Sequence, residues 1–394
     1  PNVDSRFVAA TFSDFRTIEI QLSQDIALTS GANDFSLTNG PKVISVKNLN
    51  GTEKATSYVQ LTLDSDVVIG TNYTVTHPKF GAYLVDDNKI YDSPSFAEKY
   101  TYTGDDLGAT YTKEKTKFRL WAPVASSVSL VTYSSAAATS GTSIPMKSDV
   151  NGTWVAEISG DQDGLVYTYK VAVGGNTNEA VDPYARAVTI NGKRGVVVDL
   201  GTTNPVGWNK TKPTFSGKPT DAIIYELHVR DLSMDSSAPF PKEARGKYTA
   251  FTYTNLKGSK GQPVGVAAIK DLGVTHVQLL PVFDFASVDE SNPSFNWGYD
   301  PQNYNVPEGS YSTDPANPKK RIIELKTAIQ SLHSQGLRAI MDVVFNHVYD
   351  ARSFSENLIT PGYWFRTDSS GNLTNASGCG NDVASERPMV RKFI

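Results

Sequence analysis

Strict alternation of apolar and polar residues dominates the first hundred residues of the chain. In residues 17–22 and 58–63 every second residue is apolar. A period of two puts one face of a strand in a core and the other face in water. Asn39 and Gly40 mark one of the turns between such runs. Short strands at this spacing predict a small β-sandwich over residues 1–105.

The same pattern continues in a second stretch, over residues 106–212. Residues 116–123 are typical of a strand that ends at a proline. Alternation returns in residues 127–130, in a run that continues to 133, and in residues 166–171. Residues 202–219 are rich in Pro, Gly, Lys and Thr, which is typical of a linker. We therefore expect a second β-sandwich, followed by a connection to a different kind of unit.

From residue 213 to residue 394 the pattern of apolar residues changes. Residues 222–228, 275–281 and 338–345 are nearly continuous apolar runs, as expected of buried parallel strands. Helical periodicity separates them at 264–272 and 320–335. Alternating strands and helices predict right-handed βαβ units. The expected fold is thus two β-sandwich domains followed by an α/β unit.

Composition narrows the functions that this fold could have. With 394 residues, a formal net charge of −4 and no basic stripe, the chain is not expected to bind nucleic acid. No apolar run is long enough for a membrane span. The single cysteine, Cys379, excludes an internal disulfide. The start at Pro1 predicts a processed or trimmed end, and the composition favours a secreted or cell-surface bacterial protein, with a cytoplasmic one as the alternative.

The third apolar run carries polar residues where it ends. Asp342, Asn346 and His347 flank or follow the apolar residues of this strand. Unpaired polar groups in a core cost a few kcal/mol each, so these side chains need partners or a ligand. Polar residues at the carboxyl ends of parallel strands commonly face a ligand cleft. A binding site and a structural hydrogen-bond cluster both remain open.

A second motif, Phe-Asn-Trp-Gly-Tyr-Asp-Pro, occupies residues 295–301. Aromatic rings such as Trp297 and Tyr299 stack on the apolar faces of sugars, while a carboxylate such as Asp300 binds hydroxyls. An aromatic plug beneath a long loop is the other interpretation. His276 and His333 lack metal-ligand spacing, so we predict no metal site there.

Taken together, residues 295–312 and 342–347 resemble the pullulanase-type debranching enzymes of the α-amylase superfamily, with Phe295 where tyrosine is usual. The resemblance covers residue 106 to the end and implies the first part of a (β/α)8 barrel over 213–394. It also implies a carbohydrate-binding-module-like sandwich over 106–212, for which a scaffold role is favoured because such domains often serve mainly as scaffold. More weakly, it implies an immunoglobulin-like sandwich over 1–105.

The resemblance also implies roles for individual residues. It makes Trp297, Tyr299, Asp300, Asp342, Asn346, His347 and Asn381 the candidate substrate-binding residues. Tyr299 and His347 would contact the −1 glucose, Asp300 would bind its hydroxyls, and Asp342 would support the catalytic cluster. Asp382, beside Asn381, is expected either to contact substrate or to cap a helix that begins near Ala384. The resemblance implies no required cofactor; calcium, which Asn346 binds in some members, stays open.

The implied activity is hydrolysis of α-1,6-glucosidic linkages in pullulan, glycogen or amylopectin-type glucans with retention of configuration. This needs a nucleophile and an acid/base carboxyl group. The resemblance places both after strands that would lie beyond Ile394, so we expect no catalytic residue in this chain and a second polypeptide carrying the rest of the barrel. The alternatives are an isoamylase or branching enzyme fragment, and a catalytically inert glucan-binding fragment.

Overall fold

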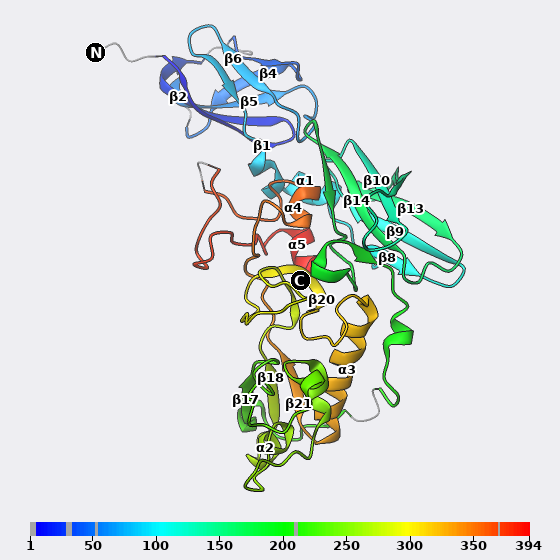
Figure 1. The fold of residues 1–394 in the computed structure, drawn as a ribbon. Coiled ribbons are helices and arrows are strands. Elements are labelled where there is room, and N and C mark those ends of the chain that lie inside the picture. The colour runs from blue at the N-terminus through cyan, green and yellow to red at the C-terminus, as the bar shows by residue number, and fades with distance from the viewer. Residues whose placement is uncertain (1–4, 29–33, 52–53, 209–211, 369–370) are drawn as a thin grey trace.

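The structure, a computed structural model, describes residues 5–28, 34–51, 54–208, 212–368 and 371–394. The molecule is elongated, with two β-rich units at one end and an α/β unit at the other (Figure 1). Across these described ranges, no helix has both the length and the apolar character needed to cross a membrane.

The first unit is a sandwich of two antiparallel sheets. Its strands are β1 (Phe7–Asp14), β2 (Thr17–Ala27), β3 (Ser36–Thr38), β4 (Val43–Asn48), β5 (Ala55–Leu63), β6 (Thr74–His77) and β7 (Gly81–Leu84). The sheet orders are β1-β2-β5-β4 and β3-β6-β7. Apolar residues from both sheets, such as Ile20 and Val75, share one core. The predicted strands at 17–22 and 58–63 are confirmed in β2 and β5.

A second sandwich follows after α1 (Pro94–Tyr100). Its strands are β8 (Gly108–Tyr111), β9 (Lys115–Trp121), β10 (Ser127–Tyr133), β11 (Thr142–Pro145), β12 (Lys147–Ser148), β13 (Thr153–Ser159), β14 (Val166–Val173), β15 (Asn176–Ala180) and β16 (Gly195–Val196). One sheet has the order β12-β13-β9-β8, and the other has β11-β10-β14-β15 with β16 also paired to β14. Leu120 and Tyr169, from opposite sheets, are both buried in the core between them.

The α/β unit contains a parallel sheet with the order β17-β18-β21. Its elements are β17 (Ile224–Leu227), α2 (Val266–Asp271), β18 (His276–Leu279), the antiparallel pair β19 (Phe283–Phe285) and β20 (Pro301–Pro307), α3 (Pro318–Ser334), β21 (Arg338–Met341), α4 (Ser355–Ile359) and α5 (Pro388–Phe393). The predicted helices at 264–272 and 320–335 are confirmed by α2 and α3. Apolar residues of α3, such as Leu325 and Leu332, share a core with Val277 of β18.

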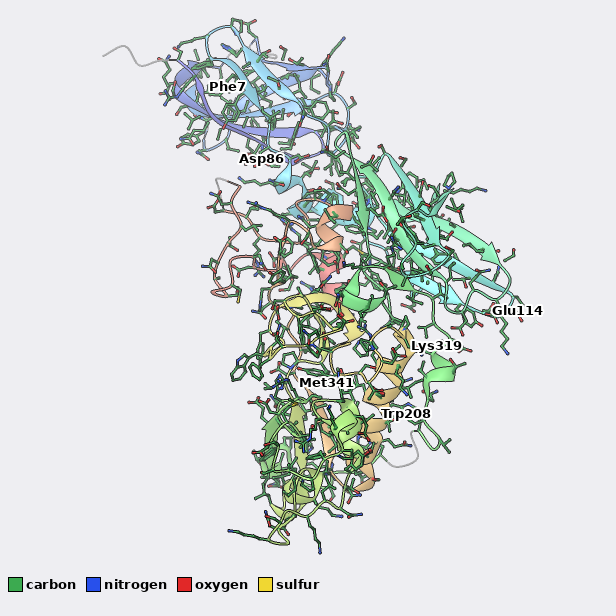
Figure 2. All side chains as sticks on the ribbon, in the orientation of Figure 1. Phe7, Asp86, Glu114, Trp208, Lys319 and Met341 are labelled. Atoms are coloured by element: carbon green, nitrogen blue, oxygen red, sulfur yellow. The ribbon has the colours of Figure 1, made fainter. Side chains whose placement is uncertain are left out.

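Short 3-10 turns fill several connections between these elements. They are η1 (Asn88–Asp92), η2 (Val150–Gly152), η3 (Ile190–Gly192), η4 (Leu200–Thr203), η5 (Pro219–Asp221), η6 (Lys242–Ala244) and η7 (Tyr248–Thr252). Lys319, at the start of α3, pairs with Asp163 of the second sandwich and so ties the two units together (Figure 2).

The expectation that all three parallel strands are buried is wrong for β17 and for β21, in which no residue is fully buried. Ile224 is 51% exposed and Tyr225 is 39% exposed, whereas Leu227 is buried. β17 is an edge strand of the three-stranded sheet, and its outer side pairs with no other strand of the described residues. Met341 at the other edge is also exposed (Figure 2). The described sheet therefore presents two apolar edges.

Two predicted boundaries are also wrong. The third parallel strand ends at Met341 rather than at Phe345. Its neighbour β18 is followed by Pro281, which has no N–H to extend the ladder. The last helix starts at Pro388 rather than near Ala384. Proline has a fixed φ that suits the first helical turn, and this favours a start at that position.

Candidate functional site

The end of β21 brings two of the predicted site residues together. The Tyr299 hydroxyl donates a hydrogen bond to Oδ2 of Asp342 over 2.8 Å. Asp342 directly follows the strand, and its backbone N–H donates to the carbonyl of Leu279 over 3.0 Å. Burial, with a smaller contribution from Asp342, raises the pKa of Tyr299 to about 12. The phenol therefore stays protonated near neutral pH and is held in place by the carboxylate.

His347 joins this pair through the backbone. Its Nε2 lies 2.7 Å from the carbonyl oxygen of Tyr299. A carbonyl oxygen only accepts, so Nε2 carries the proton and a neutral ring presents Nδ1 as an acceptor. Nδ1 is buried and has no hydrogen-bond partner among the described residues. Tyr304 fixes the other side of this segment by donating to the His347 carbonyl over 2.6 Å.

Asp300 is held within its own loop. Its Oδ2 accepts a bond from the backbone N–H of Ser287 over 2.9 Å and another from the Ser287 hydroxyl. Its Oδ1 is buried without a hydrogen-bond partner in the described part of the chain. Gly298 has a φ of +87°, and a Cβ there would lie 3.0 Å from Pro281, so the tight loop requires glycine. The loop thus fixes one carboxylate oxygen by hydrogen bonds and buries the other without a partner.

Aromatic rings cover the surface next to these residues. Trp297 is 61% exposed, and its ring centroid lies 5.8 Å from that of Phe295. Phe295 in turn packs on the buried His228, whose Nε2 lies 2.7 Å from the Asn296 carbonyl. A cavity of about 470 Å³ lies between these rings and β17. Exposed rings beside a polar site suit the apolar face of a sugar.

The two predicted asparagines have different surroundings. Asn346 is exposed, and no hydrogen bond of its side chain is found among the described residues. Asn381 is buried. Its amide oxygen accepts a hydrogen bond from the backbone N–H of Val348, and its amide nitrogen donates to the Val348 carbonyl, each over 2.9 Å. This geometry favours a positioning role for Asn381 over a direct sugar contact.

Asp382 does not cap a helix, because α5 starts at Pro388 with Arg387 as its N-cap. Its carboxylate instead accepts bonds from the hydroxyls of Thr374 and Ser377 and from the backbone N–H groups of Ala376 and Ser377. These bonds, led by the Ser377 hydroxyl, lower the pKa of Asp382. Asp382 therefore organises the loop that carries Asn381.

Sequence reasoning missed a buried ionic cluster behind the site. Arg321 of α3 is fully buried, with Nη1 3.2 Å from Asp284 Oδ1 and Nη2 2.8 Å from Glu290 Oε2. Glu308 lies beside them and accepts from the Phe285 N–H over 3.0 Å. Burial raises the pKa of Glu308 to about 7. The available signal was position: Arg321 ends a basic run, but it lies one turn before Leu325 on the face of α3 that also carries Ala328 and Leu332.

The same cluster is the one group in the described residues with the spacing of a metal site. Calcium requires six to eight oxygen ligands around a free centre. Here the guanidinium of Arg321 already supplies the positive charge to Asp284 and Glu290. A further dication would face that charge at short range, so this cluster does not fit calcium.

Two family models match the chain. Residues 106–185 match carbohydrate-binding module 48 (isoamylase N-terminal domain), and residues 263–362 match the alpha amylase catalytic domain. The first match falls on the second sandwich, and the second includes the Tyr299–Asp342–His347 cluster. These matches define a carbohydrate-active protein of the α-amylase class.

Individual relatives narrow the class. A pullulanase of Bacillus subtilis (strain 168) is 43% identical over 302 residues, which cover 76% of this chain and 41% of the relative. The structure of pullulanase from Bacillus acidopullulyticus matches with a TM-score of 0.88 and 33% identity, over 98% of this chain and 60% of the other. A pullulanase from Anoxybacillus sp. LM18-11, solved in complex with maltotetraose, has a TM-score of 0.79 and 38% identity over 98% and 54% of the two chains.

The chain thus belongs to the pullulanase-type debranching enzymes, whose N-terminal portion it matches. It spans 41% of the length of the Bacillus subtilis pullulanase, and 60% and 54% of the two solved pullulanase chains.

Proposed function

We propose that this chain provides the sugar-recognition side of a site that hydrolyses α-1,6-glucosidic linkages in pullulan, glycogen or amylopectin-type glucans. The observation that carries the proposal is the cluster of Tyr299, Asp342 and His347 at the end of β21. The Tyr299 ring is 40% exposed, and the partly exposed Asp342 carboxylate beside it supplies an acceptor. Such a set suits a glucose unit, which offers apolar C–H faces and hydroxyl donors.

The catalytic carboxylates are proposed to come from outside these residues. A retaining glycosidase needs a carboxyl group with a raised pKa as its general acid. Among the described residues, the carboxyl groups with raised pKa values are Asp87, Asp182, Asp284, Glu308 and Glu356, and desolvation by burial is the main cause in each. None of these five contacts the Tyr299–Asp342–His347 cluster through a hydrogen bond in the described structure.

The exposed edges of the three-stranded sheet support a second polypeptide segment as the source. β17 and β21 leave backbone groups unpaired, and Ile224 and Met341 are exposed beside them. Further parallel strands added at these edges would bury this surface and complete a barrel. The nucleophile and the acid/base group would then sit opposite Tyr299.

Complementation tests this proposal. The chain alone is expected to release no reducing ends from pullulan. Mixing it with a separately produced polypeptide, the part of the Bacillus subtilis pullulanase outside the matched region, is expected to restore cleavage. Pullulan cleavage by the chain alone would contradict the proposed absence of the carboxylates.

Product analysis of the restored mixture separates the alternatives. Release of maltotriose from pullulan supports debranching at α-1,6 bonds, whereas a branching enzyme would lengthen or transfer branches on glycogen. If the mixture stays inactive while the chain binds maltotriose, a catalytically inert glucan-binding fragment is the better description.

A further inference from the structure

The candidate sugar contacts Trp297, Tyr299 and Asp300 lie in the connection between β19 and β20, residues 286–300. We call this segment the site loop. The Trp297 and Tyr299 rings are both exposed to solvent, so packing in a core does not hold them in place. Their positions therefore depend on how firmly the backbone of the site loop is held.

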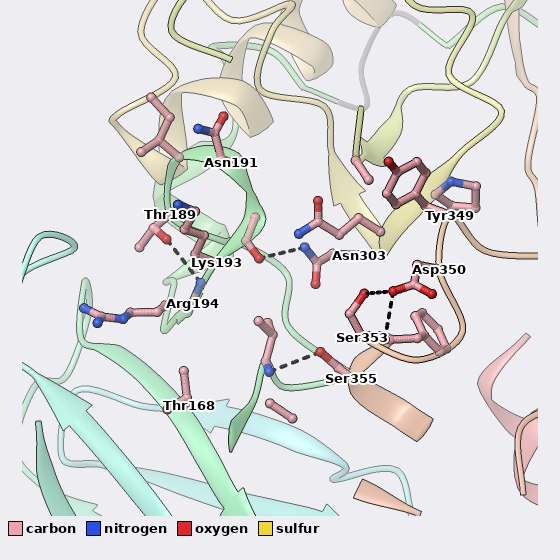
Figure 3. Close-up of a pocket in the computed structure, with 18 of the residues that line it drawn as sticks. Thr168, Thr189, Asn191, Lys193, Arg194, Asn303, Tyr349, Asp350, Ser353 and Ser355 are labelled. Atoms are coloured by element: carbon pink, nitrogen blue, oxygen red, sulfur yellow. Dashed lines mark hydrogen bonds between the residues drawn. The ribbon is translucent and has the colours of Figure 1, made fainter. Parts of the chain in front are cut away.

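Both ends of the site loop are anchored by one amide. Asn303 of β20 points toward η3 (Figure 3), and its amide donates to the Gly192 carbonyl over 3.0 Å and to Asp284 Oδ2 over 2.7 Å. Asp284 belongs to β19, so the two strands that flank the site loop are tied to each other and to η3. The tip of the loop, residues 295–298, lies beyond these anchors.

One buried side chain outside the loop holds this tip. His228 directly follows β17 and is 6% exposed. Its Nε2 lies 2.7 Å from the Asn296 carbonyl oxygen, and the Arg230 backbone N–H donates to its Nδ1 over 3.2 Å. A carbonyl oxygen only accepts and an N–H only donates, so the neutral ring with its proton on Nε2 satisfies both neighbours. The ring thus joins the end of β17 to the site loop in one defined hydrogen-bonding form.

Aromatic contacts fix the plane of the His228 ring. Its centroid lies 5.0 Å from that of Phe295 and 5.7 Å from that of Tyr311, which is buried in the core of the α/β unit. The Tyr311 hydroxyl lies 3.1 Å from Nε2, and the Arg230 guanidinium lies 5.8 Å from the Phe295 centroid. The ring packs between the tip of the loop and the core, which keeps Nε2 directed at Asn296.

Asn296 transmits this restraint to the residues that follow it. Its Oδ1 accepts from the Gly298 N–H over 2.8 Å, one residue before Tyr299. Its Nδ2 donates to the Ser287 hydroxyl over 2.9 Å and lies 3.4 Å from Asp300 Oδ2. A shift of the Asn296 backbone therefore disturbs both the turn that leads into Tyr299 and the hydrogen bonds that hold Asp300.

We propose that His228 is a positioning residue for sugar recognition, which fixes the tip of the site loop through the hydrogen bond from its Nε2 to the Asn296 carbonyl. This inference rests on the proposed function and deepens it, because it assigns part of the affinity for a glucose unit to a buried side chain that acts only through the loop. The first parallel strand thereby contributes to the site without a group of its own on the substrate.

Two amide substitutions separate this role from simple packing. Glutamine carries an amide N–H at the reach of Nε2, so His228→Gln keeps a donor for the Asn296 carbonyl. Asparagine carries an amide oxygen at the reach of Nδ1, so His228→Asn keeps an acceptor for the Arg230 N–H and loses the donor to Asn296. A role in stability alone predicts that sugar affinity follows the unfolding midpoint, whichever nitrogen is replaced.

Isothermal titration of the intact chain with maltotriose, together with urea unfolding, tests the inference. His228→Ala and His228→Asn are each expected to weaken binding about fivefold, the size of one lost buried hydrogen bond, whereas His228→Gln stays within about twofold of wild type. His276→Ala is the matched control. This histidine also packs on a ring, that of Phe215 at 5.0 Å, but it begins β18 at the opposite end of the parallel sheet and should leave the affinity unchanged.

Fluorine NMR of protein labelled with fluorotryptophan reports on the loop without any sugar. The chain has five tryptophans, and Trp297→Phe identifies the Trp297 signal. That signal is expected to shift in His228→Ala and His228→Asn, and to stay close to its wild-type position in His228→Gln and His276→Ala.

The outcomes separate this inference from the proposed function. An unchanged Trp297 signal in His228→Ala and His228→Asn, or equal maltotriose affinity of His228→Asn and His228→Gln, would overturn the inference. If Tyr299→Ala weakens maltotriose binding while the His228 variants change neither the affinity nor the signal, the proposed function stands and the inference fails. If the Trp297 signal responds as expected while wild type binds no maltotriose, the positioning of the loop by His228 stands and the proposed function fails.

Discussion

Replacing Arg321 with methionine is expected to lower the free energy of unfolding by about 3–5 kcal/mol. The guanidinium is fully buried and pairs with Asp284 and Glu290, and it also donates to the Pro307 and Pro315 carbonyls over 3.2 and 3.3 Å. Methionine fills part of the volume but leaves the buried carboxylates without a cation. Urea denaturation at neutral pH measures the loss.

Lys320→Met provides the matched control on the same helix. Lys320 is half exposed, and its ammonium lies 3.7 Å from Glu324 Oε1. Glu324 is buried but keeps the bonds that it accepts from the Thr313 N–H and hydroxyl, and the Lys320 ammonium is well solvated, so a change of about 0–1 kcal/mol is expected. If both substitutions lowered the free energy of unfolding equally, the buried cluster would not be a main contributor to stability.

The buried ionic cluster also supports the glucose site, because it fixes the two strands that flank the site loop. Asp284 is in β19, and Glu308 follows β20 and bonds the backbone of Phe285. The loop that carries Trp297, Tyr299 and Asp300 runs between these two strands. Loss of Arg321 is therefore expected to loosen the glucose site as well as the core.

The second large effect is a loss of stability as the pH rises, centred on Glu356 of α4. Glu356 is 3% exposed and packs against the second sandwich near the buried Asp182. Burial raises the pKa of Glu356 to about 8 and that of Asp182 to about 6. Both carboxyl groups thus hold their protons in the folded state at pH values where the unfolded chain has lost them.

The direction of the effect follows from these pKa values. Below about pH 4 both states bind the protons and the contribution to stability is complete. Above that pH the unfolded state releases these protons and the folded state keeps them, so the folded state becomes less stable relative to the unfolded state. This loss continues up to about pH 6 for Asp182 and about pH 8 for Glu356. We expect these two groups to lower the free energy of unfolding by about 5 kcal/mol between pH 5 and pH 8, of which Glu356 accounts for about 4 kcal/mol.

Glu356→Gln tests this attribution, because glutamine keeps the shape and cannot ionise. The variant is expected to lose the part of the fall that Glu356 causes, to keep the parts from Asp182 and Glu308, and to exceed wild type at pH 8. Glu98→Gln, at an exposed glutamate of α1, is the control and should follow the wild-type curve. A Glu356→Gln variant with an unchanged pH profile would assign the fall to other groups.

Local patterns predicted much of the fold. Alternation located β2, β5, β9, β10 and β14, and the helical period of α3 placed it to within two residues at its N-terminus. These signals are local, because each reflects which face of one element meets a core. Exposure of β17 was not predictable in this way, since it depends on which strands lie beside it.

The site was predicted less completely for the same reason. The motif at 295–301 and the residues from Asp342 to His347 were recognisable, and the structure brings Tyr299, Asp342 and His347 together. The partners of Arg321 come from three separate segments, so no spacing rule links them. The bracing of Val348 by Asn381 likewise joins residues far apart in the chain.

The account centres on Tyr299 and Asp342 as the wall of a glucose site. Isothermal titration of the intact chain with maltotriose, for wild type and Tyr299→Ala, is the most direct test of that claim. The account predicts measurable binding to wild type and a loss of affinity of about tenfold in the variant, since a ring and a hydroxyl donor are removed together. Equal affinity of the two proteins would contradict it.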